Sequence, residues 1–138
     1  MADSNDFNGK IIEEFRANGG DVGGMFAEMP ILLLHHTGAR SGKVRVNPLA
    51  YLADGDRYVI FASKGGAPVN PDWYHNLKAH PDVQIEVGAQ SLPVTATEAT
   101  GEERARLFNE QARRSPQFGD YQQKTDRQIP VIILSPTV

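Results

Sequence analysis

One stretch of the chain carries positive charge and no negative charge. From Met29 to Ala53 there is no Asp or Glu, and the same stretch contains Arg40, Lys43 and Arg45. Cations gathered in this way favour a bound anion such as a phosphate or a carboxylate. A solvated hairpin whose charge serves solubility is the alternative interpretation, and the spacing alone leaves both open.

The residues between these cations are suited to a tight turn. Gly38 and Gly42 let the backbone bring its N–H groups close to a bound anion, and the Ser41 hydroxyl supplies a further donor. The nucleotide-binding pattern G-x-x-x-x-G-K-[ST] is absent, so this is not a P-loop. We therefore expect any anion to meet the tip of a β-hairpin.

A second candidate lies where a predicted strand ends in the string ASKGG, residues 62–66. Two adjacent glycines at a strand end allow the backbone to lie against a flat ligand. In the helix predicted after this loop, Trp73 and Asn76 are one turn apart on one face. The indole can then form a wall for a planar ring, with packing of Trp73 in the core as the alternative.

Other residue types that carry chemistry indicate no further site. The chain has no cysteine, which removes disulfides and thiolate catalysis. His35 and His36 are adjacent on a predicted strand and point to opposite faces, so we expect no metal. Ser63 lacks the G-x-S-x-G elbow of a hydrolase. Tyr121 can be a proton donor or a pocket wall, and ordinary packing of a loop aromatic is the alternative.

Length and composition indicate one domain. The chain has 138 residues, a mass of 15.1 kDa and a net charge of −3, within the usual size of a single domain. The mildly acidic balance argues against nucleic-acid binding. The longest apolar run, near residues 30–34, is far shorter than the roughly 20 residues of a membrane span, and the N-terminus lacks the features of a signal peptide. We expect a cytoplasmic protein.

The turn signals and apolar runs predict mostly antiparallel strands curled into a small barrel, with flanking helices, because the connections are too short for repeated parallel crossovers. Asn8 is predicted to cap a first helix that ends at Gly19. Asn70 is predicted to cap a second helix, and Thr100 opens a third with a capping box. Strands are predicted at 31–36, 44–53, 58–62, 83–87, 92–97 and 129–134. Within one domain, residues 1–23 form a helix and a Gly-rich connection, and residues 24–138 form the barrel.

Five strings in order carry a family resemblance: TGARSG from Thr37, RVNPL from Arg45, ASKGG from Ala62, NPDWYHNLK from Asn70 and TDRQIP from Thr125. Over about residues 24–136 they resemble the deazaflavin-dependent nitroreductase family of actinobacteria. The resemblance implies a split β-barrel like that of flavin reductases. It also implies coenzyme F-420, a deazaflavin with a phosphodiester and a polyglutamate tail.

The same resemblance implies where this cofactor binds. The tail anions would meet the basic hairpin, and the ring would lie along the strand end and the glycine loop, beside the following helix. The implied cofactor-binding residues are Arg40, Ser41, Lys43, Arg45, Pro48, Ala62, Ser63, Lys64, Gly65, Gly66, Trp73 and Asn76.

The implied reaction is hydride transfer from reduced F-420 to an electron-poor acceptor, such as a quinone or an activated nitro compound. The candidate proton donors are Ser63 and Tyr121. Where a nitroimidazole reducer of the family has tyrosines, this chain has Ala50, Ser115 and Phe118 and retains only Tyr121. We therefore expect weak or absent reduction of nitroimidazole drugs, because the phenol groups that orient such a substrate are missing.

Alternative interpretations stay open. The shared barrel type allows an FMN-dependent reductase, and the pocket, poor in polar groups, allows a deazaflavin- or fatty-acid-binding protein without turnover. Related barrels form homodimers, so a homodimer is one expectation. The expected partner is a small-molecule hydride acceptor, with no nucleic acid and no transmembrane segment. A peripheral position at the membrane stays open as well, because quinone acceptors reside there.

Overall fold

The computed structural model describes residues 2–20, 30–63, 70–125 and 128–137, which contain four helices and seven strands. The helices are α1 (Ala2–Ala17), α2 (Asp72–Ala79), α3 (Gly101–Arg114) and α4 (Gln117–Gln123). The strands are β1 (Ile31–Thr37), β2 (Val44–Ala50), β3 (Leu52–Asp54), β4 (Arg57–Phe61), β5 (Asp82–Val87), β6 (Gln90–Glu98) and β7 (Val131–Pro136).

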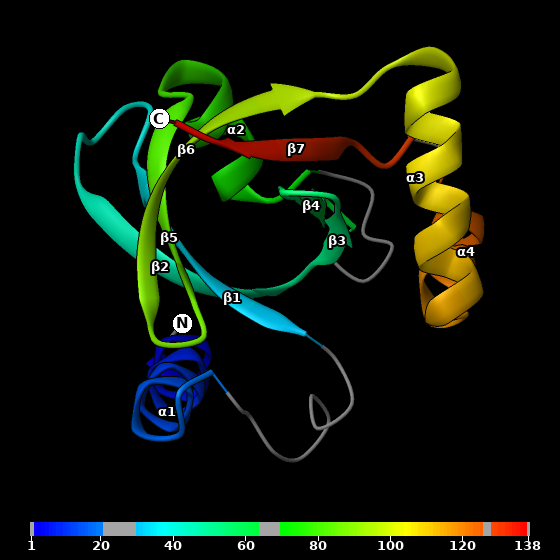
Figure 1. The fold of residues 1–138 in the computed structure, drawn as a ribbon. Coiled ribbons are helices and arrows are strands. Elements are labelled where there is room, and N and C mark those ends of the chain that lie inside the picture. The colour runs from blue at the N-terminus through cyan, green and yellow to red at the C-terminus, as the bar shows by residue number, and fades with distance from the viewer. Residues whose placement is uncertain (1, 21–29, 64–69, 126–127, 138) are drawn as a thin grey trace.

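The strands form a curled sheet that nearly closes on itself. Their order is β2-β1-β5-β6-β7-β4-β3, and every pairing is antiparallel. The two outermost strands, β2 and β3, are separated in the chain by Tyr51 alone. At Tyr51 the chain stops pairing with β1 and begins to pair with β4. The Tyr51 N–H donates to the Pro30 carbonyl at 3.1 Å, and Leu52 then pairs with Val59. The result is the predicted barrel-like antiparallel sheet with flanking helices (Figure 1).

Two apolar layers explain why several strands have continuous apolar runs. On β1, Leu32 and Leu34 face the inside of the curl, while Ile31 and Leu33 pack with Ile11 and Phe15 of α1. The strands β4 and β7 divide in the same way, with one set inside and the other beneath α3 and α4. Because both faces of these strands are covered, alternation between apolar and polar residues is lost there.

Helix α2 is anchored to the inner layer by Trp73 and Leu77, which are 6% and 3% exposed. This helix lies next to β1, and the tip of the β1–β2 hairpin approaches it. The anchoring matters for the site because α2 and the hairpin together form its walls.

Several local predictions are wrong in detail. Helix α1 begins at Ala2, so Asn8 lies inside the helix instead of capping it. Because the helical backbone already continues before Asn8, the N–H groups that follow it need no side-chain cap. The predicted strand 44–53 is divided at Tyr51 because its two halves pair with different partners.

Two predicted helix caps also differ. Thr100 is at the N-cap of α3 but makes no side-chain cap hydrogen bond. The chain enters this helix through Gly101 at φ 58°, a left-handed conformation that interrupts the backbone path on which a capping box depends. Pro71, rather than Asn70, occupies the N-cap of α2. Both helices nevertheless start within one residue of the predicted position.

Candidate functional site

The cationic stretch forms the tip of the β1–β2 hairpin, as predicted. The last pair of the ladder is Thr37 with Val44. The Gly38 N–H donates to the Lys43 carbonyl at 2.8 Å, and the Gly42 N–H donates to the Gly38 carbonyl at 2.9 Å. Gly42 has φ 71°, which glycine adopts without steric cost. The turn is thus closed by its own backbone hydrogen bonds and by the Ser41 hydroxyl oxygen, which accepts from the Lys43 N–H at 3.2 Å. The side chains of Arg40, Lys43 and Arg45 are exposed to solvent or a ligand.

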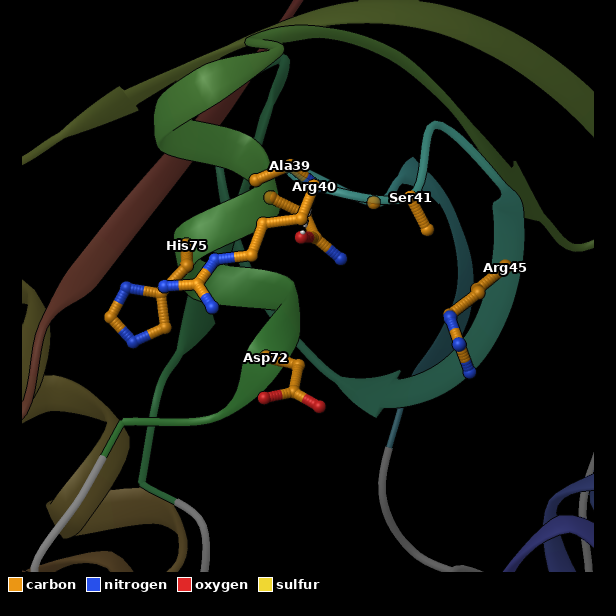
Figure 2. Close-up of a pocket in the computed structure, with 8 residues that line it drawn as sticks. Ala39, Arg40, Ser41, Arg45, Asp72 and His75 are labelled. Atoms are coloured by element: carbon orange, nitrogen blue, oxygen red, sulfur yellow. Dashed lines mark hydrogen bonds between the residues drawn. The ribbon is translucent and has the colours of Figure 1, made fainter.

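A pocket of about 540 Å³ opens between this turn and helix α2 (Figure 2). The turn contributes Arg40 and Ser41, β2 contributes Arg45, and α2 contributes the side chains opposite. The full lining is Gly38, Ala39, Arg40, Ser41, Arg45, Asp72, His75 and Asn76. Two guanidinium groups, a hydroxyl and turn amides are donors that phosphates and carboxylates prefer.

The cations of the turn differ from those elsewhere in their lack of carboxylate partners. Within the described ranges, Arg40, Lys43 and Arg45 form no ion pair. Of the residues that line the pocket, Asp72 alone is a carboxylate. The pocket therefore keeps a net positive charge, which the whole-chain charge of −3 conceals.

A buried chain of hydrogen bonds fixes the turn against α2. Asn76, 7% exposed, accepts from the Ala39 N–H through Oδ1 at 2.9 Å. Its Nδ2 lies 2.9 Å from Nδ1 of His36, and Nε2 of His36 lies 2.7 Å from Oδ1 of Asn47. His36 is 2% exposed, and burial lowers the pKa of its imidazole from the ordinary 6.5. His36 is therefore neutral at physiological pH.

The two adjacent histidines face opposite sides of β1, as predicted. His35 lies with Nε2 at 2.6 Å from the Glu86 carboxylate, which also pairs with Arg16 of α1. His36 bonds Asn47 and Asn76 on the other side. Within the residues described, no group of three or more His, Cys, Asp or Glu side chains is placed to hold a metal ion.

The predicted cofactor residues divide into three groups. Arg40, Ser41, Arg45 and Asn76 line the pocket, and Lys43 is on the same turn. Ala62 and Ser63 are buried directly after β4, at 0% and 9% exposure, Pro48 is half-buried in β2, and Trp73 packs in the inner core layer. Lys64, Gly65 and Gly66 lie outside the described residues.

Sequence reasoning missed Asp72 and His75, which line the pocket from α2 (Figure 2). The signal was available: residues 72, 75 and 76 follow the i, i+3, i+4 spacing that places side chains on one helical face. The prediction placed Trp73 and Asn76 on one face of this helix; Asn76 lines the pocket, whereas Trp73 packs in the core.

The four predicted substrate residues lie away from this pocket lining, around α3 and α4. Phe118 is 6% exposed and packs edge-on against Phe61, with ring centroids 5.7 Å apart. Tyr121 contacts the Phe118 ring at 5.5 Å, and Ala50 packs against the same apolar cluster. Ser115 is the C-cap of α3, and its carbonyl accepts from the Phe118 N–H. Ala50 and Tyr121 thus pack against one apolar cluster in which Phe118 is a core side chain, and Ser115 contacts Phe118 through the backbone.

Similar proteins were found by sequence and by structure. The family model described as F420H(2)-dependent quinone reductase matches residues 10–136. The F420H(2)-dependent quinone reductase Rv1261c of Mycobacterium tuberculosis is 47% identical over 111 residues, which cover 77% of this chain and 73% of that protein. A solved structure of an F420-H2 dependent reductase (FDR-A) has a TM-score of 0.71 at 45% identity and covers 77% of this chain and 94% of that chain. A structure described as a domain-swapped dimer has a TM-score of 0.73 at 39% identity, with 96% and 99% covered.

The curled antiparallel sheet and the cationic turn define a small barrel protein with a pocket whose donors suit an anionic ligand. The match over residues 10–136 makes the assignment specific: the chain belongs to the F420H(2)-dependent quinone reductase family. The predicted resemblance to F-420-dependent enzymes of actinobacteria is confirmed. Within the described helices, none is long and apolar enough to cross a membrane.

Proposed function

We propose that the chain is an oxidoreductase that transfers a hydride from reduced coenzyme F-420 to a quinone or another electron-poor acceptor. The family model and the relatives above name this cofactor, and they give no support to FMN. The observation that carries the proposal in this chain is the pocket whose arginines, Arg40 and Arg45, lack carboxylate partners among the described residues.

The donor set of the pocket fits an anionic tail better than a neutral ligand. Arg40 and Arg45 can bond phosphate or carboxylate oxygens in pairs, and Ser41 adds a hydroxyl donor. Lys43, on the same turn, adds charge at longer range. We assign the phosphodiester and glutamate carboxylates to this turn, because Arg40 and Arg45 are exposed cations that form no ion pair within the described residues, so an anionic ligand can reach both.

The end of β4 is the proposed place of the deazaflavin ring. Ala62 and Ser63 are buried where the chain leaves the sheet, so a ring seated beside them would be shielded from water on that side. When bound in reduced form, the cofactor supplies the hydride, and the protein contributes position, charge and exclusion of water. Ser63 and Tyr121 are the proposed proton donors to the reduced acceptor.

The acceptor site is proposed around Tyr121 and Ala50. Tyr121 is half-buried, with the Lys124 ammonium 5.9 Å from its ring centroid. Ser115 and Phe118 offer no phenol in this region, and we propose weak or absent turnover of nitroimidazole drugs. A deazaflavin-binding protein without turnover is the second candidate, since the apolar side chains here provide few groups that orient a substrate.

The assembly proposed for the chain is a homodimer. The structure with 39% identity is described as a domain-swapped dimer, and it covers 96% of this chain. Sedimentation velocity tests this proposal directly: a mass near twice 15.1 kDa supports it, and a monomer at micromolar concentration contradicts it. A cytoplasmic location and the division of the chain at residues 23 and 24 stay predictions.

Two measurements test the proposed function. Isothermal titration with F-420 and with FMN should give tight binding of F-420 alone. Mixing the protein with reduced F-420 and menadione should restore the absorbance of oxidised F-420 faster than the uncatalysed reaction. Tight binding without such acceleration across several quinones would favour the non-catalytic alternative, whereas tight binding of FMN alone would contradict the cofactor assignment.

A further inference from the structure

The buried hydrogen-bond chain beneath the turn has only one possible direction. The Ala39 N–H can only donate, so Asn76 must present its carbonyl oxygen Oδ1 to it, at 2.9 Å. The Asn76 Nδ2 then donates to His36, whose Nδ1 must accept. The remaining proton of the neutral imidazole is on Nε2, which donates to Oδ1 of Asn47 at 2.7 Å. The backbone N–H of Ala39 therefore determines which atom donates and which accepts at each step from Asn76 through His36 to Asn47 of β2.

Protonation of His36 is incompatible with this chain. An imidazolium carries protons on both ring nitrogens, so Nδ1–H would face the Nδ2 hydrogens of Asn76. Asn76 can relieve that contact only by rotating its amide, which turns Nδ2 toward the Ala39 N–H and removes the acceptor from the turn. The half-buried hydrogen bond that ties the Ala39 N–H of the turn to α2 is then lost.

We propose that His36 is a positioning residue for cofactor binding: its neutral Nε2–H form, through Asn76, holds the turn at residues 38–42 in the conformation that receives the anionic tail. This inference rests on the proposed function. His36 is buried and does not line the pocket, so it acts on the turn only through Asn76, which does line it.

The surroundings of His36 set the direction of its response to pH. Burial favours the neutral form, Arg45 of β2 and His35 of β1 favour it further by charge, and Asp72 of α2 and the hydrogen bond to Asn47 oppose them. The balance lowers the pKa of His36 below 6.5. Asn76 therefore holds the turn at pH values above the pKa of His36 in the folded protein. The affinity for F-420 falls as the pH falls through that pKa.

The test measures the dissociation constant of F-420 between pH 8 and pH 5 in four proteins. Wild type should lose affinity by about three- to tenfold on the acid side, as one hydrogen bond would give. His36→Gln should remove this acid loss, since a neutral amide can accept from Asn76 and donate to Asn47 at any of these pH values. Asn47→Asp should move the loss to higher pH, because a carboxylate stabilises the imidazolium.

His35→Gln is the matched control. It changes the neighbouring histidine, which bonds Glu86 on the opposite face. It should keep an acid loss of the wild-type size, with a midpoint moved only slightly to higher pH, because the charge of His35 is the smallest influence on the pKa of His36. Titration of the cofactor's own groups is common to all four proteins and cancels between them. A His36→Gln variant that keeps the acid loss, or an Asn47→Asp variant with an unshifted profile, would overturn the proposal.

A measurement without cofactor separates this inference from the proposed function. In the free protein, the NMR shift of the Ala39 amide should titrate with the same midpoint as the His36 ring, and it should be flat in His36→Gln. No binding of F-420 by wild type at pH 8 contradicts the proposed function and, with it, the role in cofactor binding. Binding with an Ala39 amide that ignores His36 contradicts the inference alone.

Discussion

The hairpin pocket and a second pocket within the described residues both contain arginine side chains, and their charges are arranged in different ways. The hairpin pocket, about 540 Å³, contains Arg40 and Arg45. A second pocket, about 500 Å³, lies between β3 and α3 and is lined by Arg106, Arg113 and Arg114. The second pocket has three arginines against two in the first, so the number of arginines alone does not identify the proposed anion site.

Carboxylate partners make the difference. In the β3–α3 pocket, Asp54 pairs with Arg106 and also with Arg57, and Glu110 pairs with Arg113 at 2.5 Å and with Arg114 at 3.2 Å. Hydrogen bonds from Arg113 above all lower the pKa of Glu110 to about 2, so these charges satisfy one another. In the hairpin pocket the arginines have no such partner among the described residues. An unpaired arginine can form charge-assisted hydrogen bonds to an anionic ligand without first giving up any others. A paired arginine must first break its hydrogen bonds to a carboxylate.

The largest expected effect comes from removing the unpaired cations. Arg40→Ala combined with Arg45→Ala should weaken F-420 binding by about thirtyfold or more, as the loss of two charge-assisted hydrogen bonds implies. Arg106→Ala combined with Arg113→Ala removes the same charge from the other pocket and should change affinity by less than about twofold. Calorimetric titration of the two double variants compares the pockets directly. Equal losses of F-420 affinity would contradict the proposal that only the hairpin pocket binds the anionic tail.

Salt should weaken binding in the same pattern. Raising the salt concentration from about 50 mM to 500 mM screens exposed charges, and wild-type affinity should fall by about tenfold. The Arg40→Ala and Arg45→Ala double variant should show a much flatter salt dependence, because the screened charges are gone. A wild-type dissociation constant independent of salt would contradict an electrostatic role for the turn.

A smaller effect of opposite sign is expected at Asp72. This carboxylate shares the pocket with Arg40 and opposes an anionic tail. Asp72→Asn should therefore tighten F-420 binding by about two- to fivefold, with the helix preserved. Glu110→Gln, in the other pocket, is the control and should leave the affinity unchanged. Weaker binding by Asp72→Asn would show that the carboxylate orients an arginine instead of opposing the ligand.

The smallest effect concerns stability in acid. The pKa of Glu110 is lowered in the folded protein from 4.5 to about 2, so its contribution to stability is present above pH 4.5 and is lost as pH falls toward 2. Urea unfolding midpoints should decline less steeply over this interval in Glu110→Gln than in wild type. Arg40→Ala should retain the wild-type decline, since Arg40 has no carboxylate partner in the described ranges to lose.

The sequence predicted the parts of the site that depend on local pattern. The acid-free stretch from Met29 to Ala53 and the glycines at 38 and 42 were sufficient to predict a cationic turn. Strand and helix positions followed from apolar runs and from proline and glycine signals. These features depend on residues close in the chain, which is why composition and spacing carry them.

The rest depended on contacts between distant residues. Asn76 meets Ala39 across 37 positions of sequence, and His36 meets Asn76 across 40. No spacing rule connects such residues, so the buried hydrogen-bond chain could not be predicted. The pairing of Arg106 with Asp54 across 52 positions is equally non-local, whereas Arg113 and Arg114 pair with Glu110 at the local spacings of three and four residues.

The central claim is that the unpaired arginines of the turn bind the anionic tail of F-420. Its most direct test compares two ligands, intact F-420 and the deazaflavin alcohol that lacks the phosphodiester and the glutamates, in wild type and in the Arg40→Ala, Arg45→Ala double variant. The account predicts a large loss of affinity for intact F-420 on mutation and no loss for the tail-less ligand. An equal loss for both ligands would place the arginines elsewhere on the cofactor and contradict the account.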